Sequence, residues 1–267
     1  GGPSGSGVAT TVTLGSVAWP LLAKAGYDRA SAGGLLAAGG IGAILSPPVL
    51  GAAAFLISEF LRISYLEVIA MAVIPTLLYY ASIFCMVELD ARKFGARAVT
   101  VEGESVWSLT RKYGYHFVSP VAIVAFLLWG YTATLAVVYA TLLAVAMSFL
   151  RRETALSPRR LGKALGGGAT GILSVSATCA AAGIIVGVVT LTGLGLKFSG
   201  IIIGLAGQSL FLTVVYTAVA LWILGLAVPV TASYIIAAVM LAPALTRLGV
   251  PDYAAHMFIF YYAVLSE

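Results

Sequence analysis

Two short stretches of this chain combine glycine or proline with hydroxyl-bearing residues within strongly apolar sequence. They are residues 5–11 (GSGVATT) and residues 228–234 (VPVTASY). An α-helix satisfies its own backbone, so an interruption of a buried helix leaves carbonyl and N–H groups available to a ligand. Carbonyl and hydroxyl oxygens suit a hard cation such as Na⁺, and the N–H groups at the start of a helix favour a carboxylate. Both stretches therefore predict the binding of small ions.

The residue types in both stretches suit this chemistry. Gly5 and Gly7 tolerate an unwound backbone. Hydroxyl oxygens come from Ser4, Ser6, Thr10 and Thr11 in the first stretch, and from Thr231 and Ser233, beside Pro229, in the second. A plain turn between two helices would also explain residues 5–7 without any ligand. The matching second stretch favours the ligand-binding interpretation.

The two stretches occupy equivalent places in an internal repeat. Pro20 and Pro243 lie 223 positions apart, and the same offset pairs Lys24 with Arg247. Further pairs at this offset are Ala9 with Ala232, Leu22 with Leu245, Gly26 with Gly249, and Ala32 with Ala255. Paired interruptions in two halves of a membrane chain indicate the binding site of a transporter.

The composition requires a bilayer. Of the 267 residues, 61% are hydrophobic and 9% are charged, whereas a soluble domain carries about 25% charged residues. Apolar stretches of about 20 residues, the length that crosses a membrane as a helix, recur along the chain. We therefore expect an all-α, polytopic helical membrane protein that has the lipid bilayer as its main solvent.

The positive charge is concentrated in two loops. Ten of the fifteen lysines and arginines lie within residues 92–112 and 151–163, and the formal net charge is +5. Loops of this kind face the cytoplasm, where anionic lipids attract them. A nucleic-acid-binding protein would instead carry a basic face on a soluble module, so we expect no nucleic-acid partner. Cys85 and Cys179 are isolated in apolar runs, which argues against a transition-metal site.

Proline divides the first part of the chain. We expect a broken first helix over residues 8–24 and a second segment over residues 30–61, which Ser46-Pro47-Pro48 splits. Proline lacks an N–H and disfavours helix in the residue before it, so a helix ends there. The carbonyls left without helical donors are those of Ala43, Ile44 and Leu45. They are candidate ligands, and simple helix termination is the alternative.

The rest of the chain predicts further helices. The expected segments are residues 65–87 with a kink at Pro75, two helices within 117–150 that meet at residues 130–132, an amphipathic helix at 151–163, and segments at 168–195, 198–227, 229–246 and 253 to the end. If all of them span the bilayer, the two broken helices are the first and eighth crossings and form an inverted repeat. If residues 168–195 form a re-entrant hairpin, this count changes.

These segments suggest four parts. They are part of a first repeat (residues 1–88), a polar connector (89–116), a helical hairpin with a basic arm (117–165) and a truncated second repeat (166–267).

Few residues could support catalysis. The histidines are His116 and His256, and no phosphate-binding loop is present. An intramembrane hydrolase would need a nucleophile beside a base, so we expect no enzyme. A carrier is favoured, and another ion-coupled carrier or a channel with re-entrant helices is the alternative. His256 begins an apolar helix and is either a hydrogen-bonded structural residue or a substrate contact.

Several runs resemble the large membrane subunit of tripartite ATP-independent periplasmic (TRAP) transporters. These runs are GPSGSGVAT at residues 2–10, PLxxKxGY at 20–27 and SPP at 46–48. Three others are similar to the TAXI subclass, whose permeases are often fused into one chain: GAAAF at 51–55, IPxLLYY at 74–80 and HMFxFY at 256–261.

This resemblance implies a sodium-driven elevator carrier in a bacterial or archaeal plasma (inner) membrane. In that family an extracytoplasmic binding protein delivers a carboxylate-bearing substrate, and a small membrane subunit, separate or fused, accompanies the permease. No cofactor is implied, because Na⁺ serves as the coupling ion.

The resemblance also assigns residues. The family's sodium-binding positions match Ser4, Gly5, Ser6 and Thr10, then Ser46 and Pro47, and finally Pro229, Thr231 and Ala232. Residues 168–195 would be the outward-facing hairpin. Another hairpin would precede Gly1, so we expect the chain to be a fragment of a longer permease.

Overall fold

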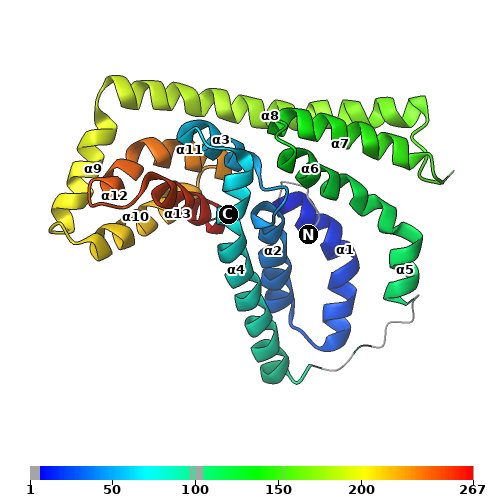
Figure 1. The fold of residues 1–267 in the computed structure, drawn as a ribbon. Helices are drawn as coiled ribbons and strands as arrows, with labels where there is room; N and C mark the ends of the chain where they lie inside the picture. The colour runs from blue at the N-terminus through cyan, green and yellow to red at the C-terminus, as the bar shows by residue number, and fades with distance from the viewer. Residues whose placement is uncertain (1–6, 97–98, 100–104, 152, 267) are drawn as a thin grey trace. The chain divides into compact units, whose positions relative to one another are not determined.

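The described part of the chain is helical. A computed structural model describes residues 7–96, 99, 105–151 and 153–266, and Figure 1 shows it as a ribbon. Helices joined by short turns account for most of these residues, and no strand occurs among them. The predicted all-α class is confirmed.

The chain divides into two compact units. The first takes the described residues up to Gly51 together with Ser64–Lys163, and the second takes Ala52–Ile63 together with those from Ala164 onward. A short helix, α3 (Ala52–Leu61), therefore belongs to the second unit although its sequence lies between helices of the first.

The first unit contains two packed groups of helices. Its elements are α1 (Gly7–Ala25), α2 (Arg29–Leu45), α4 (Tyr65–Phe94), α5 (Val106–Tyr113), the 3-10 turn η1 (Gly114–Phe117), α6 (Val118–Leu128) and α7 (Ala133–Ser148). Helix α2 packs against α1 and α4, and α6 packs against α7. Gly130, with a φ of 86°, makes the turn between α6 and α7, as predicted for residues 130–132.

Local sequence sets the helix starts in this unit. Asp28 accepts hydrogen bonds from the backbone N–H groups of Ala30 (3.0 Å) and Ser31 (3.2 Å) and so caps α2. Ser64 and Glu67 form a capping box at the start of α4. These side chains satisfy N–H groups that have no partner within the helix.

Helix α4 is longer than predicted. It runs to Phe94 rather than to residue 87, and the ion pair of Glu88 with Arg92 at 2.8 Å lies on the additional part. The left-handed Gly95, with a φ of 59°, then ends the helix. Two described helices, α4 and α8 (Pro158–Leu191), are long and apolar enough to cross a bilayer.

The second unit packs around a C-terminal helix. Its elements are α3, most of α8 (Pro158–Leu191), α9 (Leu194–Leu205), α10 (Leu210–Gly225), α11 (Val230–Met240), α12 (Ala242–Thr246) and α13 (Asp252–Leu265). Helix α13 contacts α3, α10, α11 and α12. The largest side chains of its core, Tyr234 and Phe260, have no exposed surface.

Three expectations for residues 151–227 are wrong: the amphipathic helix at 151–163, the hairpin alternative for 168–195, and the single segment at 198–227, which is divided into α9 and α10. Helix α8 is unbroken over 34 residues, so residues 158–163 belong to its first turns and not to a separate amphipathic helix, and residues 168–191 are not a hairpin. No proline follows Pro158 within α8 to interrupt it. The turn between two helices lies instead between α9 and α10, where Gly207 (φ 57°) and Gln208 (φ 64°) are left-handed.

The backbone contains the repeat that the sequence predicts. Pro20 lies within α1 and Pro243 within α12, 223 positions apart. Helices α2 and α13 begin at Arg29 and Asp252, again 223 positions apart. One copy lies in each unit.

The turn between the two helices of each copy also matches. Gly26 has a φ of 100° and Gly249 a φ of 90°, values that glycine adopts without a steric penalty. The N–H of the residue after each glycine donates to the carbonyl five positions earlier, over 3.1 Å in the first copy and 3.2 Å in the second. The repeat therefore extends from helix starts to backbone hydrogen bonds.

Gly40 tests the packing of α1 on α2. A Cβ at Gly40 would lie 1.9 Å from Thr11 Oγ1 and 2.7 Å from the Gly7 carbonyl oxygen, whereas a Cβ at Gly39 would meet nothing within 4 Å. Gly40→Ala should therefore lower the free energy of unfolding by roughly 1–3 kcal/mol, the usual cost of overpacking. Thermal unfolding of the purified full-length protein in detergent measures this, with Gly39→Ala as the control. Equal stability of the two variants would contradict the close contact.

Candidate functional site

The first described turns of α1 lie beside the second half of α2. The Thr11 hydroxyl donates to the Leu36 carbonyl over 3.4 Å, and the Gly7 carbonyl lies against Gly40. Because earlier residues of α1 meet later residues of α2, the two helices are antiparallel. The N-terminal end of one helix therefore meets the C-terminal end of the other.

Part of the predicted cation site lies in the first unit, at the end of the α1–α2 pair that contains Gly7. Thr10, Ser46 and Pro47 are described, whereas Ser4, Gly5 and Ser6 lie outside the described residues. Thr10 is one turn into α1 and only 5% exposed. Ser46 and Pro47 directly follow the last residue of α2. The antiparallel pairing brings these two groups to the same end of the helix pair.

The carbonyls at the end of α2 have partners. The buried Thr76 hydroxyl of α4 donates to the Leu45 carbonyl over 2.7 Å, and the Gly51 N–H donates to the Ile44 carbonyl over 3.0 Å. The prediction that these two carbonyls are unpaired is therefore wrong, because the chain folds back and α4 supplies a hydroxyl. A carbonyl oxygen has a second lone pair, so one hydrogen bond does not preclude a second contact.

Hydroxyl groups of α4 fix the last turns of α2. Besides Thr76, Tyr79 donates to the Ala38 carbonyl over 2.7 Å, and the Tyr80 hydroxyl lies 2.6 Å from the Ser46 hydroxyl. Sequence analysis did not assign a role to these three residues of α4. Their spacing of three and four positions places them on one helix face, which is the signal that could have found them.

The second stretch contains the start of α11. Residues 226–229 are not helical, Pro229 occupies the N-cap position, and Thr231 and Ala232 lie in the first turn. Ser233 is fully buried and donates its hydroxyl to the Val228 carbonyl over 2.8 Å. The interruption is thus a loop between α10 and α11, and Ser233 holds that loop against the first turn.

Ser233 is the counterpart of Thr10 at the repeat offset. Both carry hydroxyls, both are buried, and each lies in the first turns of its helix. In the sequence, the repeat offset pairs their neighbours, Ala9 and Ala232. The structure shows that the hydroxyl-bearing residues beside them are both buried.

Two helix C-terminal ends meet in the second unit. Ser266, at the end of α13, lies against Gly225, the last residue of α10. Helix α11 begins five residues after Gly225. A helix end carries partial negative charge and favours a cation, while a helix start favours an anion. The contact between Gly225 and Ser266 is therefore suited to a cation.

A further interruption, at Leu241, was not predicted. Pro243 has no N–H for the Val239 carbonyl, and the Ala244 N–H donates to Leu241 instead of to Met240. The Ser199 hydroxyl of α9 donates to the freed Met240 carbonyl over 2.7 Å. In the first copy α1 is continuous from Gly7 to Ala25 through Pro20. The prediction of a broken helix over residues 8–24 is therefore wrong, and the proline alone does not decide the break.

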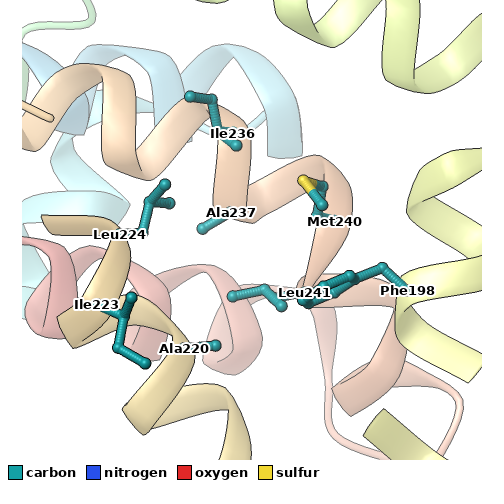
Figure 2. Close-up of a pocket in the computed structure, with 8 residues that line it drawn as sticks. All are labelled: Phe198, Ala220, Ile223, Leu224, Ile236, Ala237, Met240 and Leu241. Atoms are coloured by element: carbon teal, nitrogen blue, oxygen red, sulfur yellow. The ribbon is translucent and has the colours of Figure 1, made fainter. Parts of the chain in front are cut away.

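A cavity of about 270 Å³ lies next to this interruption (Figure 2). It is bordered by Phe198 of α9, Ile223 and Leu224 of α10, and Met240 and Leu241 at the break. Every lining residue is apolar. The cavity therefore lacks the polar groups that a charged substrate would require.

His256 forms a specific pair with Tyr234. Its Nδ1 lies 2.7 Å from the Tyr234 hydroxyl, and the Phe60 ring of α3 lies 6.1 Å from the Tyr234 ring and 6.2 Å from the His256 ring. These contacts agree with the alternative in which His256 is a hydrogen-bonded structural residue. Sequence analysis did not identify Tyr234 as its partner. Among the described residues, no three His, Cys, Asp or Glu side chains gather where a metal ion could be held.

One protein family matches the whole chain. Its sequence model, described as "Tripartite ATP-independent periplasmic transporter, DctM component", covers residues 1–267. No curated protein and no solved structure matches the chain.

The Thr76 hydroxyl should stabilise the end of α2. Thr76→Val keeps the shape but leaves the buried Leu45 carbonyl without its donor, which should cost roughly 1–3 kcal/mol of unfolding free energy. Thr76→Ser keeps a hydroxyl and should be closer to the wild type. Unfolding of the two variants in a denaturing detergent titration measures the difference. If Thr76→Val is as stable as the wild type, this hydrogen bond does not hold the helix end.

Proposed function

Because this chain belongs to the DctM family, the DctM component of tripartite ATP-independent periplasmic transporters, we propose that it takes up a carboxylate-bearing small molecule together with Na⁺. The family consists of membrane transport proteins that work with a periplasmic binding protein and a small membrane subunit. In the proposed cycle, the binding protein delivers the substrate to this multi-pass permease in the inner membrane. The sodium gradient then drives accumulation without a nucleotide.

The antiparallel packing of α1 on α2 is the observation that carries this proposal. In the first unit the first described turns of α1 lie beside the second half of α2. In the second, the start of α11 follows the contact between Gly225 and Ser266. Cations are favoured at helix ends and carboxylates at helix starts. The two ligands of a symporter thus have suitable groups within one region.

The proposed sodium ligands are backbone and hydroxyl oxygens at these interruptions. They are contributed by Ser4, Gly5, Ser6, Thr10, Ser46, Pro47, Pro229, Thr231 and Ala232. Oxygen ligands suit a hard cation. The Ser233 hydroxyl, bonded to the Val228 carbonyl, holds the second interruption in a fixed shape, which reduces the ordering cost of binding.

Charge neutralisation explains the proposed coupling. Moving one elementary charge through a membrane potential of 100 mV changes the energy by about 2.3 kcal/mol, and a bare charge in the bilayer costs more. A cation bound near the substrate carboxylate cancels this charge. In the proposed elevator movement the transport domain therefore crosses readily only when both ligands are bound.

His256 is the proposed substrate contact. It is partly exposed and sits at the start of α13. A histidine ring nitrogen that carries a proton donates a hydrogen bond to a carboxylate. Because Tyr234 occupies Nδ1, Nε2 is the nitrogen that remains for the substrate.

The Thr231 hydroxyl tests the sodium assignment. The full-length permease would be reconstituted with its small subunit and binding protein, using the carboxylate that mass spectrometry identifies in the purified binding protein. Thr231→Val should raise the half-saturating Na⁺ concentration for uptake about tenfold, equivalent to about 1.4 kcal/mol of binding free energy. Thr231→Ser, which keeps the hydroxyl, is the control. An unchanged sodium dependence in Thr231→Val would remove this residue from the site.

Counterflow distinguishes the carrier from a channel. Vesicles loaded with unlabelled substrate should transiently accumulate labelled substrate, because a carrier exchanges one for the other across the membrane. A channel with re-entrant helices only equilibrates the label. Absence of counterflow in vesicles that do take up substrate would refute the carrier.

A further inference from the structure

Tyr234 connects the start of α11 to His256. It is the fifth residue of α11, and its side chain has no exposed surface. Its hydroxyl lies 2.7 Å from Nδ1 of His256 on α13. The preceding residue, Ser233, donates its hydroxyl to the Val228 carbonyl. One short segment thus contacts both the loop before α11 and the histidine.

Aromatic neighbours hold the Tyr234 ring on two sides. Phe60 of α3 stacks on it, with ring centroids 6.1 Å apart and an angle of 27°. Phe260 of α13 meets it edge-on, at 6.5 Å and 84°. Both arrangements are favourable for aromatic pairs. The ring is therefore fixed, and the position of its hydroxyl follows the backbone of α11.

The hydrogen bond determines which nitrogen of His256 carries the proton. Neutral imidazole has one donor and one acceptor nitrogen, and the hydrogen bond made by one nitrogen sets the state of the other. Two arrangements fit the 2.7 Å distance: the Tyr234 O–H donates to Nδ1, or Nδ1–H donates to the phenol oxygen. The Tyr234 side chain has no exposed surface, and a buried O–H without an acceptor is costly. The first arrangement is therefore favoured, and it places the ring proton on Nε2. His256 thereby presents an N–H donor on the side of the ring away from Tyr234.

We propose that Tyr234 is a positioning residue that holds His256 in the Nε2–H form and couples the start of α11 to substrate recognition. This proposal rests on the proposed function, in which Na⁺ binds at residues 229–232 and His256 contacts a carboxylate. A cation bound there holds the first turn of α11 in place, and Tyr234 lies in the next turn. Sodium binding therefore fixes the position of the His256 Nε2–H group, which donates a hydrogen bond to the substrate carboxylate.

The first test observes the tautomer with Na⁺ as the only ligand. Full-length permease labelled with ¹⁵N-histidine would be placed in lipid nanodiscs, and the signals that disappear in His256→Gln identify His256. In saturating Na⁺ we expect an unprotonated Nδ1 and a protonated Nε2 in the wild type, and a mixture of the two tautomers in Tyr234→Phe. A wild-type His256 that carries its proton on Nδ1, or is unaffected by Tyr234→Phe, would overturn the proposal.

The second test separates a substrate contact from a purely structural histidine. The amide nitrogen of glutamine reaches the place of Nε2, whereas asparagine reaches only the place of Nδ1. If Nε2–H binds the substrate, His256→Asn should raise the KM for the carboxylate about tenfold, as expected for one lost hydrogen bond, and His256→Gln should raise it less. The reverse order, or equal losses, would show that the bond to Tyr234 is all that His256 provides.

The third test measures coupling. Tyr234→Phe keeps the ring but loses the hydroxyl, so the KM for the carboxylate should become nearly independent of Na⁺. Tyr27→Phe, which removes a hydroxyl bonded to the Val87 carbonyl at 3.2 Å, is the matched control. A Tyr234→Phe protein with wild-type sodium dependence of KM would refute the coupling. If wild-type uptake needs no Na⁺ at all, the proposed function fails, whereas the tautomer measurement still decides the role of Tyr234.

Discussion

A helix that ends inside an apolar protein leaves backbone groups that other parts of the chain must satisfy. Hydroxyl side chains do this at each described interruption. Thr76 and Ser199 donate to the carbonyls at the ends of α2 and α11, and Ser233 donates to the loop before α11. These bonds allow helix starts and helix ends to stay adjacent in fixed positions, and a preorganised site of that kind binds an ion with little further ordering.

The repeat is the part of the fold that the sequence predicts best. The offset between Pro20 and Pro243 recurs in the starts of α2 and α13 and in the positive φ of Gly26 and Gly249. Prediction succeeded there because proline, glycine and capping residues act within one turn of chain. The same holds for the turn at Gly130 between α6 and α7.

Features that depend on a neighbouring helix could not be predicted. Both copies carry the same proline, but only the second is interrupted, and there Ser199 of α9 receives the freed carbonyl. The expected hairpin at residues 168–195 is a continuous helix as far as Leu191, and the turn falls between α9 and α10. In the candidate site, Tyr234 looks like an ordinary core aromatic in the sequence. Its role follows only from its contact with His256, a residue 22 positions away.

The site assignment depends on a cation occupying these interruptions. High-resolution maps of the full-length permease, recorded in Na⁺ and in choline, would test this directly. We expect an ion in Na⁺, surrounded by backbone and hydroxyl oxygens of residues 226–232 or of the equivalent stretch in the first repeat, and no such density in choline. A map in saturating Na⁺ and substrate that shows both stretches without an ion, or an ion coordinated elsewhere, would contradict the account.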